Sequence, residues 1–167
     1  MNKAIKYISL SAKNNCIEAQ YMLGVLYMEG RYVVRDIYKA IYYFKLAANQ
    51  NDLRSLCNLG FIYYYEQFDD HDPNKAIKYL TQAANQNHLK SQCLLGGVYL
   101  LGKYVKPDIN KAIHYFSLAA KRNYSHAQYI LGDIYFYGKY VQCDINKAIY
   151  YISLAASQNH SDAQFEL

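Results

Sequence analysis

Histidine directly follows serine or aspartate at two places in the chain, and both are candidates for catalytic chemistry. Ser125 precedes His126, and Asp69, Asp70 and His71 form a second run. Nucleophilic catalysis needs a nucleophile, a base and an orienting group that converge in one pocket. The spacing of these residues does not fix such convergence. We therefore expect no catalytic residue, no cofactor and no enzymatic activity.

Four cysteines are the other candidates for reactive or metal-binding side chains: Cys16, Cys57, Cys93 and Cys143. Zinc sites place two cysteines two to four residues apart, and no pair here has that spacing. The sequence therefore predicts no metal site. Free cysteine usually behaves as a small apolar residue, so we expect reduced thiols in or near the core.

A row of lysines offers a third chemistry, the binding of phosphate. Equivalent lysines recur at regular spacing and stand in the first turn of a predicted helix, where a cation is unfavourable for the helix dipole: Lys39, Lys75, Lys111 and Lys147. Such a row could follow a nucleic-acid backbone. Alternatively, each stem covers apolar surface and each ammonium pairs with a neighbouring carboxylate. The net charge of +5 comes from scattered residues without a run of like charges, which indicates only mild basicity.

The lysine row belongs to a repeat that fills the chain. The triplet Lys-Ala-Ile begins at positions 3, 39, 75, 111 and 147, with a step of 36 residues and no insertion. A fixed period of this length is typical of a solenoid, in which each unit packs only on its neighbours. We therefore predict a single all-α solenoid domain over residues 1–167.

Each repeat predicts two helices. One follows an aspartate suited to cap its first turn, at Asp36, Asp72, Asp108 and Asp144, and the segment 2–14 has the same pattern. The other begins near Ile17, Leu53, Leu89 and Ser125 and carries a leucine, a glycine and a tyrosine at fixed positions. A glycine inside a helix costs about 1 kcal/mol relative to alanine, so its recurrence indicates close contact with another helix.

The loop between the two helices is a further repeated feature. Gly30, Gly102 and Gly138 follow the first helix of three repeats as a C-terminal stop. The second repeat lacks this glycine, and we expect its loop, residues 66–72, to be irregular.

These elements resemble the Sel-one-like repeat (SLR), one of the tetratricopeptide-like α-solenoids. The pattern A-x-Y-x-L-G-x-x-Y, the loop Gly-x-x-Val, the aspartate and the Lys-Ala segment all fall in register from Ala19 to Asn49. The resemblance implies a right-handed α-solenoid of antiparallel helix pairs. Its repeats would span residues 17–52, 53–88, 89–124 and 125–160, with residues 1–16 as an orphan second helix and 161–167 as the start of a truncated fifth repeat.

The resemblance also implies a function, because SLR proteins serve mainly as adaptors and scaffolds that assemble other proteins. We expect a protein-protein interaction scaffold that binds a partner peptide or helix in a concave groove lined by the first helices. The candidate contacts are positions that vary between repeats on one helix face, with aromatic residues as anchors and acidic residues setting charge preference. They are Phe61, Tyr64, Tyr65, Phe136 and Tyr137, together with Glu29 and Asp133. Some of these residues could instead pack against the next repeat.

Two other functions stay open at this level. The chain could be an RNA-binding repeat protein that uses the lysine row and exposed tyrosines, or a spacer within a larger protein. The sequence also suggests self-association through open solenoid ends. No apolar run approaches the ~20 residues of a membrane helix, and residues 1–15 lack the apolar centre of a secretory signal, so we expect a cytoplasmic location.

Overall fold

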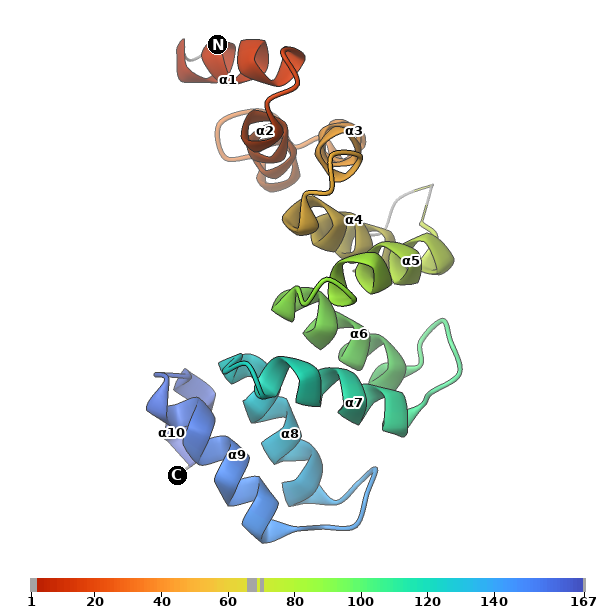
Figure 1. Ribbon diagram of the computed structural model, residues 1–167, viewed down its shortest axis with the longest axis vertical. Helices are drawn as coiled ribbons and strands as arrows, with labels where there is room; N and C mark the ends of the chain where they lie inside the picture. Colours follow the sequence, from red (N-terminus) through yellow and green to blue (C-terminus); the bar gives the residue numbers. More distant parts are fainter. Residues whose placement is uncertain (1–2, 66–68, 70, 167) are drawn as a thin grey trace. The chain divides into compact units, whose positions relative to one another are not determined.

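The computed structural model of the protein is built from helices, and it describes residues 3–65, 69 and 71–166 (Figure 1). It divides into two compact units, Met1–Gln86 and Asn87–Leu167, which we call the N-terminal and C-terminal units and describe separately. The N-terminal unit contains α1 (Lys3–Lys13), α2 (Ile17–Glu29), α3 (Ile37–Ala48), α4 (Leu53–Tyr65) and α5 (Pro73–Ala84). The C-terminal unit contains α6 (Leu89–Leu101), α7 (Ile109–Ala120), α8 (Ser125–Tyr137), α9 (Ile145–Ser157) and α10 (Ser161–Glu166).

The helices form the pairs that the repeat predicts. Each first helix packs on the second helix of the same repeat, as α2 does on α3 and α8 does on α9 (Figure 1). Within the described ranges there are ten helices and no strand. The predicted all-α solenoid with a 36-residue repeat is therefore confirmed.

Aspartate caps fix where the second helices begin. The Oδ1 atoms of Asp36, Asp108 and Asp144 accept hydrogen bonds from backbone N–H groups three residues later, at 2.9 to 3.0 Å. Asp72 caps α5 in the same way, with Pro73 as the first helical residue. These hydrogen bonds lower the pKa of Asp36, Asp72 and Asp144. The predicted N-terminal caps are confirmed.

Glycine and asparagine residues with positive φ form turns at the ends of the helices. Gly30, Gly102 and Gly138 end their helices in the left-handed region, as predicted. The turn into the next first helix uses an asparagine with φ near +62°, a conformation that asparagine tolerates better than most residues. This turn recurs at Asn15, Asn51, Asn87, Asn123 and Asn159. The irregular loop expected at 66–72 falls largely outside the described residues.

The glycines inside the first helices explain how closely the paired helices approach. A Cβ atom on Gly24 would lie 2.5 Å from the Phe44 ring, and one on Gly96 would lie 2.7 Å from the Phe116 ring. The repeated leucine beside this glycine is fully buried at every copy: Leu23, Leu59, Leu95 and Leu131. The predicted close contact of first and second helices is therefore present, and it forms the core of each repeat.

Candidate functional site

The repeated lysines are engaged inside their own repeats. Each ammonium lies 3.1 to 3.7 Å from the aspartate that caps the same helix, as Lys39 does with Asp36. Each also lies 5.0 to 5.4 Å from the centre of the repeated tyrosine ring of the first helix, as Lys39 does with Tyr27. The aspartate is the main reason that the pKa values of Lys39 and Lys147 are raised. The geometry therefore supports a local structural role for the lysine row.

The candidate residues of the N-terminal unit lie on α2 and α4 with different exposure. Tyr64 is 1% exposed, so its ring offers no surface to a partner. Tyr65 is exposed, and its ring lies 5.0 Å from the half-buried ring of Phe61. Glu29, at the end of α2, is exposed and pairs with Arg31 at 3.1 Å. Tyr65 and Phe61 thus form a small aromatic surface on α4.

The candidate residues of the C-terminal unit all lie on α8. Phe136 and Tyr137 are 49% and 68% exposed, and their rings meet edge to face at 5.1 Å. Asp133 lies one helical turn before Tyr137 and is partly buried. Asp133 and Tyr137 both line one pocket, so the structure brings these two predicted residues together.

This pocket lies between consecutive first helices of the C-terminal unit and has a volume of about 390 Å³. Pockets for small ligands span roughly 300 to 1,000 Å³, so it can take one long side chain with part of its backbone. Its wall combines residues of α6 and α8 with one ring of α7 and the start of the loop after α8. The lining residues are Gly97, Leu100, Leu101, Phe116, Ile130, Asp133, Ile134, Tyr137, Lys139 and Tyr140.

Asp133 is the acidic group of this mainly apolar wall. Its Oδ1 atom is buried and has no hydrogen-bond partner among the described residues. Burial raises the pKa of the carboxyl group, and the negative charges of Glu166 and Asp162 on α10 raise it further. The ammonium of Lys139, in the same lining, lies over the Tyr140 ring at 5.1 Å. A buried acceptor without a donor is costly, so a hydrogen-bond donor added beside Asp133 would stabilise it.

A glycine opens the hollow beside Asp133. Val25, Phe61, Gly97 and Asp133 occupy the same position in the four successive repeats. At this position, α2 and α4 of the N-terminal unit carry the apolar side chains of Val25 and Phe61. In the C-terminal unit, α6 has a glycine without a side chain and α8 has a carboxylate. The missing side chain at residue 97 leaves space at the point where α6 and α8 both reach the pocket.

Sequence reasoning missed most of the apolar wall. Ile130 and Ile134 line the pocket from α8, and Phe116 reaches it from α7. Ile134 and Phe116 count among the buried core residues, so a sequence pattern assigns them to packing. The signal that could have found the pocket is the change from Phe61 to Gly97 at equivalent repeat positions.

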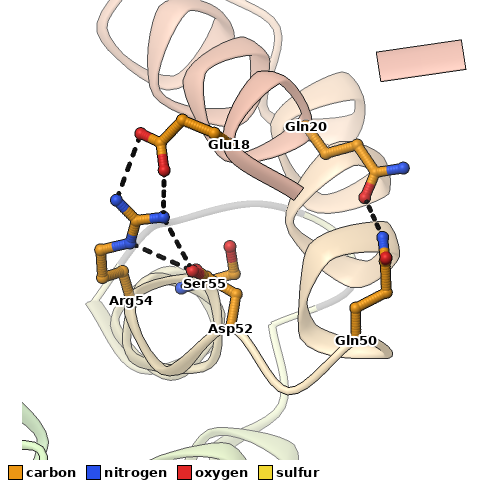
Figure 2. A network of polar contacts seen from close by, with 6 residues as sticks. All are labelled: Glu18, Gln20, Gln50, Asp52, Arg54 and Ser55. Atoms are coloured by element: carbon orange, nitrogen blue, oxygen red, sulfur yellow. Dashed lines mark hydrogen bonds and ion pairs between the residues drawn. The ribbon is translucent and has the colours of Figure 1, made fainter. Parts of the chain in front are cut away.

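A polar network in the N-terminal unit was also not predicted (Figure 2). The Arg54 guanidinium donates two hydrogen bonds to Glu18, at 2.7 and 3.2 Å, and two to Asp52, at 2.9 and 3.1 Å. Glu18 and then Asp52 raise the pKa of Arg54. Asp52 also caps α4 by accepting from the Ser55 N–H at 2.7 Å. The network ties the start of α2 to the start of α4.

A second side-chain pair of the same unit lies within one repeat, as Figure 2 also shows. Gln50 donates to Gln20 at 2.8 Å, and Gln20 donates to the Ala12 carbonyl at 3.2 Å. The C-terminal unit repeats this arrangement, with Gln158 donating to Gln128 and Gln128 to the Ala120 carbonyl. Gln20 and Gln128 are buried, and their hydrogen bonds have a structural role.

In the C-terminal unit, a histidine occupies the position that Arg54 has in the N-terminal unit. His126 Nδ1 lies 3.4 Å from His160 Nε2, and the His160 ring stacks on Tyr129 at 4.8 Å. Burial lowers the pKa of His126, and the charge of His160 lowers it further while Asp162 opposes the shift. Three or more side chains of the types that bind metals do not gather anywhere in the described chain.

None of the helices that the structure describes has the length and apolarity needed to cross a membrane. The four cysteines form no disulfide, with Cys57 and Cys93 buried and Cys16 and Cys143 exposed.

Comparison with known proteins gives matches over the whole solenoid. The family model described as Sel1 repeat matches residues 17–52, 53–88, 89–124 and 125–160. The chain is similar to a Sel1 repeat protein of Oxalobacter formigenes, with 32% identity and a TM-score of 0.87, covering 99% of this chain and 67% of that one. No curated protein matches at a significant level.

Two further solved structures show the same likeness. A protective antigen of uropathogenic Escherichia coli with an SLR fold is 27% identical, with a TM-score of 0.80, and the match covers 98% of this chain but only 35% of the antigen. Cysteine-rich protein B of Helicobacter pylori is 30% identical, with a TM-score of 0.62, and the match covers 83% of this chain and 99% of that one.

Proposed function

Because this chain belongs to the Sel1 repeat family, whose members commonly serve as protein-interaction scaffolds, we propose that it is a non-enzymatic adaptor that binds a partner peptide or helix along its first helices. The observation that carries this proposal is the pocket between α6 and α8. Two first helices supply most of its wall, and exposed aromatic rings stand on α8 beside it.

The residues around the pocket have the chemistry of an interaction surface. Aromatic anchors give much buried area for little lost entropy, and Tyr137 and Phe136 are exposed in this way. Leu101, on the opposite helix, is 61% exposed and lines the same pocket. In the N-terminal unit the proposal keeps Tyr65, Phe61 and Glu29 as a second contact surface. It leaves out Tyr64, whose ring is buried.

A quantitative pull-down from lysate of the source cell tests the proposal. The bait is the wild type beside a Leu101→Ala/Tyr137→Ala double variant, with and without nuclease. The control is Tyr150→Ala, because Tyr150 is also exposed and meets its neighbour Tyr151 edge to face, but lies on the second helix α9.

We expect the wild type and Tyr150→Ala to retain a set of proteins that the double variant does not retain. Nuclease treatment should leave this set unchanged. A catch that vanishes with nuclease would favour RNA binding. A catch that the double variant keeps in full would contradict the pocket as the binding surface. Circular dichroism of all three proteins establishes that the variants keep the wild-type helical signal.

A further inference from the structure

We propose that the pocket between α6 and α8 receives a lysine or arginine side chain from a peptide segment of the partner, and that Asp133 binds the charged end of that side chain. This inference rests on the proposed function and deepens it, because it names the chemistry of the partner residue that enters the pocket. The occupant is a basic side chain, with the peptide backbone lying across α6 and α8.

The apolar wall fits the stem of such a side chain. Leu100 on α6 and Ile130 and Ile134 on α8 present hydrocarbon to the space. Lysine and arginine carry three or four methylene groups that bury well against apolar surface while the charged end stays with polar groups. Tyr137 and Tyr140 complete the wall with aromatic rings, which also attract cations.

The carboxylate supplies the specific contact. The buried Oδ1 atom of Asp133 lacks a donor among the described residues, and a guanidinium or ammonium group would provide one. Charge-assisted hydrogen bonds of this kind are about twice as strong as neutral ones. The site therefore has an acceptor that the protein itself leaves unused.

The surrounding charges favour a cation over an anion. Burial raises the pKa of Asp133, and the charges of Glu166 and Asp162 raise it further, which means that negative charge gathers around this carboxyl group. Lys139 is the cation of the lining, and its ammonium lies over the Tyr140 ring. An entering cation would relieve the repulsion among the three carboxylates, whereas an entering anion would add to it.

A peptide selection tests the inference with a library of short random peptides displayed on phage. The library is selected on the wild type, and the binders are synthesised and measured by isothermal titration calorimetry. For each binder, a matched peptide replaces the basic residue by norleucine, which keeps the methylene stem and removes the charge. Each pair is measured on the wild type, Asp133→Asn and Gly97→Val.

We expect the selected peptides to share one lysine or arginine, and the norleucine replacement to weaken binding about tenfold or more. Asp133→Asn keeps the size of the side chain and should abolish the difference between the two peptides of a pair, which a double-mutant cycle measures. Gly97→Val introduces the residue that Val25 supplies at the equivalent position, and it should weaken both peptides by filling the hollow.

Two contrary results separate the inference from the proposed function. Binders that Gly97→Val weakens, but that carry no basic residue or lose nothing with norleucine or with Asp133→Asn, would overturn the inference and leave the pocket as a peptide site. If no peptide binds, or if binding ignores Gly97→Val, the pocket is not a peptide site and both proposals fail.

Discussion

The two units of the chain share their packing and differ on the surface where consecutive first helices meet. Leu59 in the N-terminal unit and Leu95 in the C-terminal unit occupy the same repeat position and are both fully buried. The aspartate caps have the same geometry in both units. These two features of the repeat are therefore the same in both units.

The surfaces between first helices have little in common. The N-terminal unit joins α2 and α4 through the ion pairs of Arg54 with Glu18 and Asp52. At the position of Arg54, the repeats of the C-terminal unit carry Lys90 and His126 instead. The hollow lined by Gly97 and Asp133 occurs in this second unit. The comparison shows that packing constrains one face of each first helix and leaves the other face free to acquire binding chemistry.

The largest expected effect tests whether the two cores are equivalent. Leu59→Ala and Leu95→Ala each remove a fully buried side chain, so each should lower the free energy of unfolding by about 2–5 kcal/mol. Urea denaturation followed by circular dichroism measures the loss. The two losses should agree to within about 1 kcal/mol, since the substitutions fall at one repeat position. A large difference would show that the units do not share one packing arrangement.

Two neighbouring glycines sharpen the comparison between core and pocket. A Cβ atom on Gly96 would lie 2.7 Å from the Phe116 ring, so Gly96→Val should cost about 1–3 kcal/mol through overpacking. Gly97 instead lines the pocket, and Gly97→Val should change stability by only about 0.5 kcal/mol. The midpoint of thermal unfolding compares the two variants. Equal destabilisation would mean that residue 97 also packs in the core.

The network of the N-terminal unit should make a smaller contribution. Arg54 bridges two carboxylates, but its side chain is 42% exposed, so solvent screening reduces the value of these ion pairs. We expect Arg54→Met to lower the free energy of unfolding by about 1 kcal/mol, and less at high salt. Lys90→Met is the matched control at the equivalent position and should change stability by less than about 0.5 kcal/mol. An equal loss from both variants would contradict a stabilising role of the network.

The repeat made most of the fold predictable. Aspartate before each second helix and glycine after three of the first helices marked the boundaries, because capping and left-handed backbone have narrow residue preferences. The asparagines of the turns between repeats were not singled out from the sequence, although asparagine tolerates positive φ better than most residues. For the lysine row, the sequence indicated a local alternative in which each ammonium pairs with a neighbouring carboxylate, and the structure shows that this carboxylate is the aspartate cap.

The candidate site was only partly predictable, because exposure at a varying position depends on residues from other helices. Tyr64 and Phe136 occupy the same position of two repeats, yet Tyr64 is buried and Phe136 is exposed. Asp133 and Tyr137 were found because they vary in type along one helix face. The hollow between them and α6 depends on Gly97, which the sequence shows only as a change from Phe61 at the equivalent repeat position and not as a residue with binding chemistry.

The smallest expected effect separates the two units by their response to pH. Burial and the charge of His160 hold the pKa of His126 below its usual 6.5, so the unfolded chain binds a proton more readily than the folded one. The stabilisation from neutral His126 is therefore complete above about pH 6.5 and is lost as the pH falls through the lower folded pKa. Tyr129 and Asp162 also border the pair, and Asp162 moderates the effect by attracting the proton.

The melting temperature of the wild type should consequently fall between about pH 7.5 and pH 5.5. His126→Gln should remove part of this fall, because glutamine does not titrate. Arg54 stays charged throughout this range, so Arg54→Met should lower the melting temperature equally at both pH values. If His126→Gln left the fall unchanged, the pH response would arise elsewhere than at the histidine pair.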